Sequence, residues 1–504
     1  MKKILAMIIA FAFVFALLVG CNETADTESG NESVLEQSVE SKNDAAESEA
    51  ESKAESSEAS IESKDEELNI ADYFAETFDR SDGSKIYCID NAEQLYNFAN
   101  LVNKENIDFD GDVVLLRNDI ELNPTDNIDD WENNPPENKW TPIGTTVPFK
   151  GIFVGGYAKD NGFNTYLYEN EPKTISGIYC TYNKNGTALF ASIEDAIISS
   201  ITLGEGKIIG NDEEIKDKTA GFVVYADDSM LSGCFNYADV SGRNAAGIVY
   251  NAGGSTIYAT NYGKITAVHD AAGIAGGVSD SEIQSKNYGE INGVNAAGIV
   301  YDRNGSADIR CCVNEAKVTA THIAAGILGS GSSWGAAVIA SCVNYGEIVG
   351  GEIAGGIIGD LWEEQTATWV IDVLNVGSVT TLRYDEDSPL GEPYGSAGGI
   401  VGRLTCLSID GLGDFRLDGA LNLGKITAPN EYGAIIGNEP KKQNINLFAN
   451  CYYLNTTVKE SAVGVSVKES QLTDAKALEG LLDGMNWEID TELGHPVLVH
   501  VFVY

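Results

Sequence analysis

The chain has 504 residues, of which 76 are acidic and 32 are lysine or arginine, and its formal net charge at pH 7 is −44. A chain this acidic is repelled by phosphate backbones and anionic lipid surfaces, so nucleic acid is excluded as a partner. Calcium, basic surfaces and neutral glycans stay open, as does a solvated surface without any electrostatic partner.

The first twenty residues predict a secretory signal peptide. Lys2 and Lys3 form a basic start, and residues 4–19 are an apolar run that ends abruptly at Leu-Val-Gly-Cys, residues 18–21. Those four residues resemble the bacterial lipobox, which implies cleavage before Cys21 and a diacylglycerol on its thiol. A plain secretory signal is the alternative. We expect a bacterial cell membrane lipoprotein that is held through a lipid anchor and exposed on the cell surface.

Residues 21–68 follow as the lipidated cysteine and an acidic tether. Positions 22–68 consist almost entirely of Glu, Ser, Ala, Asp, Asn, Thr and Lys, with 16 acidic residues against three lysines. Such a segment buries too little apolar surface to offset the entropy of ordering, so we expect a disordered spacer between the membrane and the folded region.

Residues 69–112 are expected to form an N-terminal cap. The stretch Asp90 to Asn103 predicts a helix, with Asp90 and Glu93 as a capping box. Leu95, Phe98, Ala99 and Val102 fall on one helical face, which could cover the open end of a core.

A repeat organises the chain from there on. Asn-x-small-x-Ile/Val recurs with spacings of 25, 26, 27, 30, 31 and 47 residues, at Asn236, Asn261, Asn287, Asn314, Asn344, Asn375 and Asn422. A second element, small-Gly-apolar-apolar, follows each asparagine, at Gly247, Gly273, Gly298, Gly326, Gly356, Gly399 and Gly433. Two fixed points with insertions between them are typical of a solenoid.

Each unit consists of short Val/Ile-rich pieces broken by Gly and Asn, which predicts strands and turns. We therefore predict an all-β fold, a right-handed parallel β-helix over residues 113–455 whose coils stack about 4.8 Å apart. Stacking predicts columns: the asparagines bonded from coil to coil, an apolar residue four positions later, and alternating charges between them. Cys234, Cys312 and Cys342 fall in a small-residue column and are expected to be buried, inert thiols. Residues 456–504 are expected to form a small C-terminal cap, with a short helix before a final strand.

The order of motifs resembles that of bacterial surface proteins built from GLUG-motif repeats. The N-terminal strings NAEQLYNFANLVN, GDVVLLRNDIELN, WTPIG, FKGIFVGG and TISGI follow that family closely. Its Gly-Leu-any-Gly signature appears as GIAG, GILG, GIIG and GIVG at Gly273, Gly326, Gly356 and Gly399. The resemblance spans residues 85–500 and implies a right-handed β-helix on a bacterial surface. Because such repeats accompany both peptidase domains and adhesins, it names no activity.

No catalytic motif stands out. The four histidines, His269, His322, His495 and His500, lie outside any Gly-His-Gly or His-Glu-x-x-His string. Carboxylate pairs of the kind that glycosidases use stay open in so acidic a chain. We therefore lean against an enzyme, with an atypical β-helix polysaccharide lyase or glycoside hydrolase as the alternative and a passive spacer as a second one.

Two features are candidates for binding. Aromatic residues follow the Gly-apolar element in four of five successive coils and could stack sugar rings along one flank, or pack under loops: Tyr250, Tyr301, Trp334, Trp362 and, close behind, Trp369. The insertion after Asn375 carries four carboxylates that could bind calcium or simply be solvated: Asp385, Glu386, Asp387 and Glu392. No other cofactor is expected. The sequence thus predicts a monomeric surface binding or adhesion module whose partner is an extracellular glycan or a host surface component.

Overall fold

The computed structural model describes residues 68–499, with gaps at 163–164, 333–334, 364–366, 384–394, 407–414, 430, 439–447, 459–460 and 483–485. All of these residues belong to one compact unit, Glu67–Tyr504. Among them, no helix is long and apolar enough to cross a membrane. Cys21 and the four carboxylates of the predicted calcium loop lie outside the described residues.

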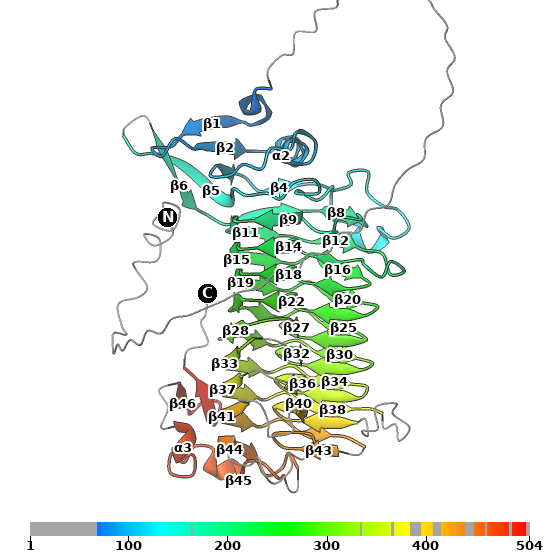
Figure 1. The fold of residues 1–504 in the computed structure, drawn as a ribbon, viewed down its shortest axis with the longest axis vertical. Coiled ribbons are helices and arrows are strands. Elements are labelled where there is room, and N and C mark those ends of the chain that lie inside the picture. The colour runs from blue at the N-terminus through cyan, green and yellow to red at the C-terminus, as the bar shows by residue number, and fades with distance from the viewer. Residues whose placement is uncertain are drawn as a thin grey trace, which may run out of the picture. The chain divides into compact units, whose positions relative to one another are not determined.

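The fold is a parallel β-helix, which confirms the predicted class. Each coil of the described part runs through four sheets in turn, and each strand pairs in parallel with its equivalent one coil later. A representative coil passes through β15 (Met230–Asn236), β16 (Asp239–Gly242), β17 (Ala245–Ala246) and β18 (Val249–Gly253) before it re-enters the first sheet at β19 (Thr256–Asn261). Figure 1 shows the equivalent strands stacked along the long axis.

We number the sheets 1 to 4 in the order in which a coil visits them. Sheet 1 also includes strands of the caps and consists of β1 Glu76–Asp79, β2 Lys85–Ile89, β3 Val113–Leu116, β4 Ile120–Glu121, β5 Ile152–Asp160, β6 Tyr166–Asn170, β7 Lys173–Ser176, β10 Ile197–Ser199, β11 Ile201–Leu203, β15, β19, β23 Ser281–Ile283, β24 Lys286–Asn287, β28 Ala307–Arg310, β29 Val313–Asn314, β33 Ala337–Asn344, β37 Thr368–Asn375, β41 Arg416–Asn422, β44 Phe448–Leu454 and β45 Val465–Val467. Sheet 2 consists of β8 Ile178–Thr181, β12 Gly206–Ile209, β16, β20 Ile265–Ala267, β25 Ile291–Gly293, β30 Val318–Ala320, β34 Ile348–Gly350, β38 Val379–Thr381 and β42 Ile426–Thr427.

The other two sheets have equally regular orders. Sheet 3 consists of β13 Thr219–Ala220, β17, β21 Asp270–Ala272, β26 Asn295–Ala297, β31 Ile323–Ala325, β35 Ile353–Gly355, β39 Ser396–Gly398 and β43 Glu431–Gly433. Sheet 4 consists of β9 Phe190–Glu194, β14 Val223–Asp227, β18, β22 Ala275–Ser279, β27 Val300–Arg303, β32 Leu328–Ser332, β36 Ile358–Glu363 and β40 Val401–Cys406.

The asparagine column is confirmed as an interior ladder. All seven asparagines are fully buried, and the Nδ2 of each of the first six donates to the Oδ1 of the next one at 2.8–2.9 Å. Each Nδ2 also donates to the carbonyl oxygen two residues later in its own turn, as Asn314 does to Ala316 at 2.9 Å. The side-chain amides are thereby paired inside the core, where an unpaired amide would cost about 1–3 kcal/mol.

The second repeat element exists because of the ladder. A Cβ at Gly298 would lie 2.4 Å from the Cγ of Asn314, and one at Gly326 would lie 2.6 Å from the Cγ of Asn344. The glycines therefore let the turn between sheets 3 and 4 approach the asparagine of the following turn. The glycine motif and the asparagine motif of the repeat are thus the two partners of one contact between neighbouring coils.

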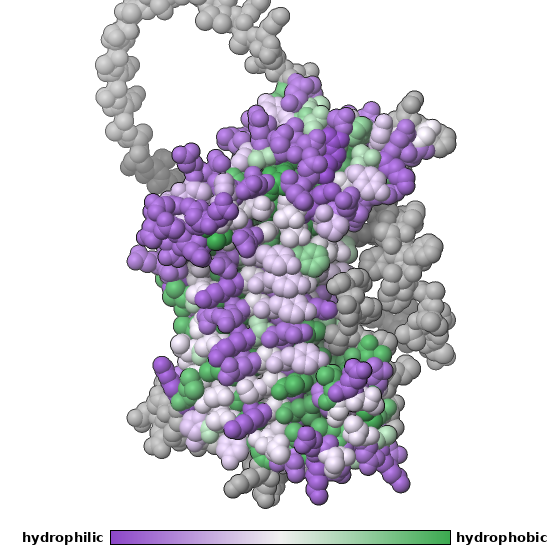
Figure 2. All heavy atoms as spheres, turned by 180° about the vertical axis from the view of Figure 1, so that it is seen from behind, coloured by the Kyte–Doolittle hydropathy of each residue, from purple (hydrophilic) through white to green (hydrophobic). Residues whose placement is uncertain are grey.

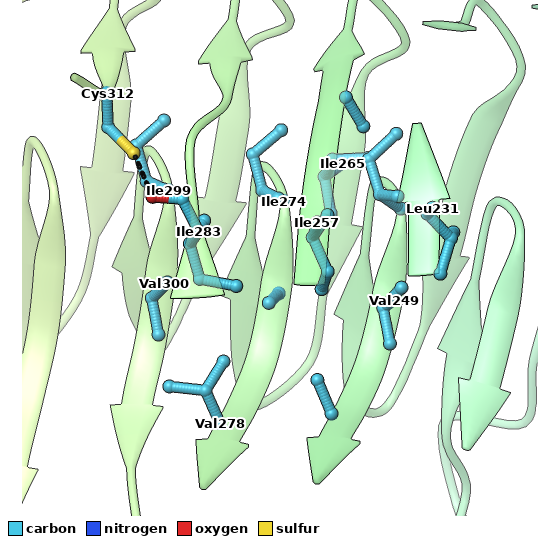
Figure 3. Packing of buried hydrophobic residues seen from close by; sticks show 14 of the residues in the cluster. Leu231, Val249, Ile257, Ile265, Ile274, Val278, Ile283, Ile299, Val300 and Cys312 are labelled. Atoms are coloured by element: carbon cyan, nitrogen blue, oxygen red, sulfur yellow. Dashed lines mark hydrogen bonds between the residues drawn. The ribbon is translucent and has the colours of Figure 1, made fainter. Parts of the chain in front are cut away.

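Aliphatic side chains fill the rest of the interior in matching columns. The residue four positions after each asparagine is 0–6% exposed, as predicted, in the column Val240, Ile265, Ile291, Val318, Ile348, Val379 and Ile426. Figure 3 shows such residues pointing inward from neighbouring coils, with the Cys312 thiol bonded to the carbonyl oxygen of Ile283 at 3.3 Å. Cys234, Cys312 and Cys342 are fully buried, as expected, and are free thiols.

The predicted charge alternation is supported at one pair of coils. Lys317 Nζ lies 2.8 Å from Glu347 Oε2, and both side chains are about half exposed. The strand registers also bring Asp239 beside Lys264, whose backbone N–H donates to the Asp239 carboxylate at 3.1 Å.

Both ends of the stack carry caps. Helix α2 (Ala92–Glu105) buries Leu95, Phe98, Ala99 and Val102, as predicted, but its N-cap is Asn91. The Asn91 side chain accepts from the backbone N–H of Gln94, and the Gln94 side chain accepts from that of Asp90, so the predicted Asp90/Glu93 box is wrong by one position. Short 3-10 turns lie at η1 Ile70–Tyr73, η2 Ile128–Asp130 and η4 Glu469–Gln471.

At the C-terminal end, the predicted short helix is α3 (Glu479–Leu482). The final strand β47 (His495–Leu498) pairs antiparallel with β46 (Trp487–Asp490). Trp487 anchors this hairpin on sheet 1, since its Nε1 donates to the Asp372 carboxylate at 2.8 Å.

Candidate functional site

The predicted aromatic flank is not a single exposed surface. Tyr250 is only 8% exposed and packs, with the partly buried Tyr301, against buried alanines of sheet 3. Each ring covers a glycine of the next coil, because a Cβ at Gly276 would lie 2.7 Å from the ring of Tyr250, and one at Gly329 would lie 2.7 Å from that of Tyr301. These two tyrosines fill the angle between sheets 3 and 4. They therefore serve in packing, which was the alternative to stacking on a sugar.

The three predicted tryptophans divide differently. Trp369 is 48% exposed, but it lies on sheet 1, between Val338 and Arg416 of the neighbouring coils, and not with the tyrosines on sheet 4. Trp334 and the side chain of Trp362 lie outside the described residues. Of the five predicted platform residues, Trp369 is therefore the one for which the structure describes a largely exposed ring.

The tyrosine that follows a ladder asparagine, in Asn-Tyr-Ala or Asn-Tyr-Gly, places another aromatic column on the surface. Tyr237, Tyr262 and Tyr288 follow three successive ladder asparagines and are 39–46% exposed. Their rings are nearly parallel and stack at centroid distances of 4.5 and 4.9 Å. Figure 2 shows side chains of like hydropathy arranged in columns along the solenoid. Stacking covers both faces of Tyr262 and one face each of Tyr237 and Tyr288, so the column presents mainly ring edges to a ligand, whereas sugar stacking requires a face.

A cleft lies where the coil geometry is irregular, beside the first strands of sheets 2 and 3. It has a volume of about 240 Å³. We call it the lysine–tyrosine cleft, and it is lined by Tyr182, Asn183, Lys184, Gly186, Glu214, Lys216, Asp217, Lys218 and Tyr225. Regular coils turn from sheet 2 to sheet 3 within two residues, as at 243–244, whereas residues 210–218 occupy the same corner between β12 and β13. This insertion and the turn after β8 form the walls.

Two tyrosine rings with open surface line the cleft. Tyr182 is 40% exposed and Tyr225 is 36% exposed. The floor requires a glycine, because Gly186 has φ +119° and a Cβ there would lie 2.8 Å from a methyl carbon of Val224. Sequence reasoning missed this site, since its residues come from two turns outside the repeat and follow no common spacing.

The charges of the cleft are unusual for this chain. The Lys218 ammonium lies 4.9 Å from the ring centroid of Tyr225 and 5.3 Å from that of Tyr250, and burial lowers its pKa. The neighbouring Asp217 is 3% exposed, and burial raises the pKa of its carboxyl group. Its Oδ2 accepts from the Thr219 hydroxyl at 3.1 Å. The cleft thus combines ring faces, hydrogen-bonding groups and cations, the set that binds a polar ring compound.

A second cluster of titratable groups runs along the corner between sheets 2 and 3. Asp270 Oδ1 lies 2.8 Å from His269 Nδ1 and accepts from Asn295 Nδ2 at 3.0 Å. His322 continues the line, with Nδ1 at 3.0 Å from Asn295 Oδ1 and Nε2 at 3.1 Å from Glu352 Oε2. In the part of the chain that the structure describes, no three His, Cys, Asp or Glu side chains form a group that could hold a metal ion.

This polar line contacts the buried tyrosines. Burial, Asp270 and Asp302 raise the pKa of Tyr301, to which a hydrogen bond with Asp270 contributes. Burial also raises the pKa of the Asp302 carboxyl group. A carboxyl group whose pKa is raised beside a second carboxyl group is the pattern of an acid–base pair, although structural networks produce it as well.

Comparisons with known proteins give few likenesses. No protein-family model matches this chain, and no curated protein sequence matches it. A solved structure from Bacteroides ovatus, described as a "putative immunoglobulin A1 protease", is 13% identical with a TM-score of 0.31, over 85% of this chain and 95% of that one. A second structure, described as "IgA1 Protease", is 14% identical with a TM-score of 0.32, over 72% of this chain and 21% of that one. The second match thus spans about a fifth of a longer protein, and at these TM-scores neither likeness carries an argument about what this chain does.

Proposed function

We propose that this chain is a bacterial surface lipoprotein whose β-helix binds an extracellular glycan without transforming it. The lysine–tyrosine cleft carries this proposal, because two partly open tyrosine rings, Tyr182 and Tyr225, line one cavity with lysines and the buried carboxyl group of Asp217. Sugars bind to proteins through stacking on such rings, with polar groups fixing the orientation. The lipobox-like residues 18–21, the acidic tether and the resemblance to GLUG-repeat surface proteins support the cellular location.

A glycan array probed with the purified protein from residue 22 onward tests the binding. We expect a defined set of glycans to bind, and Tyr225→Ala to weaken that binding about tenfold while the thermal midpoint changes little. Tyr432→Ala is the matched control, since Tyr432 is 49% exposed on β43, far along the chain from the cleft. Absence of binding to every glycan would favour a passive spacer, and equal losses for both variants would remove the cleft from the proposal.

Anchoring is tested separately by fractionation of cells that express the full chain. Cys21→Ala removes the thiol that would receive the diacylglycerol, so the protein should appear in the medium or keep its signal peptide. A variant that stays in the membrane fraction, processed like the wild type, would contradict the lipobox interpretation.

A polysaccharide lyase or hydrolase is the second candidate, and the cluster of Asp270, Tyr301 and Asp302 favours it. The raised pKa of the Asp302 carboxyl group favours its acid form, and His269 and Asn295 orient the neighbouring Asp270 carboxylate. Incubation with polysaccharides, followed by assays for new reducing ends and unsaturated products, tests this directly. Activity that Asp302→Asn abolishes would establish the enzyme and overturn the non-catalytic proposal.

A further inference from the structure

Three lysines, Lys184, Lys216 and Lys218, line one cavity of an acidic protein. Five lysines elsewhere in the described residues pair with carboxylates, among them Lys150 with Glu194 at 2.6 Å and Lys173 with Glu171 at 3.0 Å. Within the described residues, Lys184, Lys216 and Lys218 form no such ion pair, although the chain has 76 acidic residues. Three lysines against Glu214 and Asp217 give the lining a formal charge of +1, in a chain whose overall charge is −44, and such a local excess attracts an anion.

Lys218 is the member of the set that the fold positions. It precedes β13 directly, so its backbone is fixed by the pairing of Thr219 with Ala245. Its ammonium lies over the rings of Tyr225 and Tyr250, which stabilise a cation by about 0.5–2 kcal/mol and limit its rotamers. An ordinary surface lysine pays side-chain entropy when it binds, and Lys218 has already lost much of that freedom.

From this arrangement, and resting on the proposed function, we infer that the lysine–tyrosine cleft selects saccharides that carry an anionic group. The ring of Tyr225 would support one face of the sugar, while Lys218, with Lys184 and Lys216 at the rim, would pair with the sugar's carboxylate or sulfate. Charge-assisted hydrogen bonds are about twice as strong as neutral ones, so the anion would contribute more than a hydroxyl at the same place. Glu214 and Asp217 are left to accept hydrogen bonds from hydroxyl groups.

The test compares acidic glycans with matched neutral ones. An array carries uronate-containing and sialylated glycans, each beside its carboxyl-reduced counterpart, and sulfated glycans beside their desulfated forms. We expect acidic members to bind at least about tenfold more tightly than their neutral counterparts, with an affinity that falls as salt rises. Which acidic arm binds identifies the anion.

Two variants of Lys218 and one control variant test whether this lysine causes the preference for acidic glycans. Lys218→Met should lower the affinity for the acidic glycan about tenfold and abolish much of its salt dependence, whereas Lys218→Arg should keep both. Lys425→Met removes the same charge from an exposed position on a late coil and should bind as the wild type does. Thermal midpoints of all variants show whether they are folded.

The outcomes separate this inference from the proposed function. Binding to neutral counterparts as tight as to acidic glycans, with loss in Tyr225→Ala, would overturn the selection for anions and leave glycan binding in place. A Lys218→Met variant no weaker than Lys425→Met would overturn the role of the cleft lysine. Absence of binding to any glycan on the array would overturn both proposals.

Discussion

The first coils of the solenoid are filled with aromatic rings, whereas the coils from β15 onward are filled with aliphatic side chains and asparagines. Beneath α2, the rings of Phe98, Phe109, Phe149, Phe153 and Phe190 are at most 2% exposed and contact one another at centroid distances of 5.3–6.3 Å. Aromatic rings can pack together in several orientations, so they can fill coils that differ in shape. A ladder of identical side-chain amides requires that each coil repeat the same turn at the same position.

This difference explains where the candidate site lies. The insertion 210–218 falls between β12 and β13, one coil before Asn236 begins the ladder. From β16 to β35 the same corner is closed by turns of one or two residues, and the groove beside it is filled by Tyr250 and Tyr301, while a longer segment, 382–395, joins β38 to β39. The irregular coils thus provide the cavity, and the regular coils provide a rigid support. The predictions below test that division in order of decreasing effect.

The strongest test removes one member of the ladder. Asn314→Ala deletes three buried hydrogen bonds, to Asn287, Asn344 and Ala316, and leaves a cavity. We expect a loss of about 3–5 kcal/mol in the free energy of unfolding, measured by urea denaturation. Asn292→Ala, at a partly exposed position on the outside of β25, should change it by less than about 0.5 kcal/mol. Equal effects would show that the ladder contributes little stability.

A second test fills the space that the ladder requires. Gly326→Ala places a Cβ 2.1 Å from the carbonyl oxygen of Gly356 and 2.6 Å from the Cγ of Asn344, so the turn must shift. We expect a loss of about 1–3 kcal/mol in the same assay. Gly277→Ala meets its nearest atom, a flexible Asn251 oxygen, at 3.2 Å, and should be nearly neutral. A silent Gly326→Ala would argue against the coupling of the two repeat motifs.

A third test uses the buried thiols of the regular core. Burial raises the pKa of Cys234 from its ordinary value of 9.0 to about 12, so the unfolded chain ionises first as pH rises. The contribution of this thiol is complete below pH 9.0 and is lost between there and about 12, at about 1.4 kcal/mol per pH unit. Unfolding free energies across this window should fall less steeply for Cys234→Ala than for the wild type. Parallel curves would contradict the burial of the thiol.

The smallest effect is expected on the outer tyrosine column. Tyr262→Ala removes a ring that stacks on Tyr237 and Tyr288, which should cost about 1 kcal/mol of stability. Glycan binding at the cleft should stay unchanged, because this column presents mainly ring edges to a ligand. A loss of binding without a loss of stability would move the binding surface from the irregular coils to the regular ones.

The regular half of this comparison could be predicted from the sequence. Within most coils the glycine of the second motif follows the asparagine by 11 or 12 residues, so the sequence shows that the two motifs repeat together, as their contact between Gly298 and Asn314 requires. The inward direction of Ile265 and Ile291 follows from the two-residue period of a strand. The N-cap was predicted at Asp90 and lies at Asn91, but the helix itself was placed correctly.

The irregular half could not be predicted in this way. Tyr250 points outward, as its position in the strand implies, but it is buried because sheet 3 bends back beside it, which depends on the angle between two sheets. Lys218 and Tyr182 meet only because an insertion in one coil lies beside a turn of the preceding coil. No periodic pattern in the sequence indicates either arrangement. Tyr262 was visible in the repeat, yet whether its ring faces solvent or another ring depends on the coil spacing.

The ladder also bears on how such a chain can change its length. Each asparagine donates to an identical residue above it and accepts from an identical residue below, so a duplicated coil would find the same partners that its neighbours already have. Gain or loss of a whole coil leaves every interior contact of its type intact, while a shift of a single residue breaks them all. Recombination between repeats can therefore produce longer and shorter solenoids that still fold. In such proteins the first coils and their cleft would lie at different distances from the C-terminal cap.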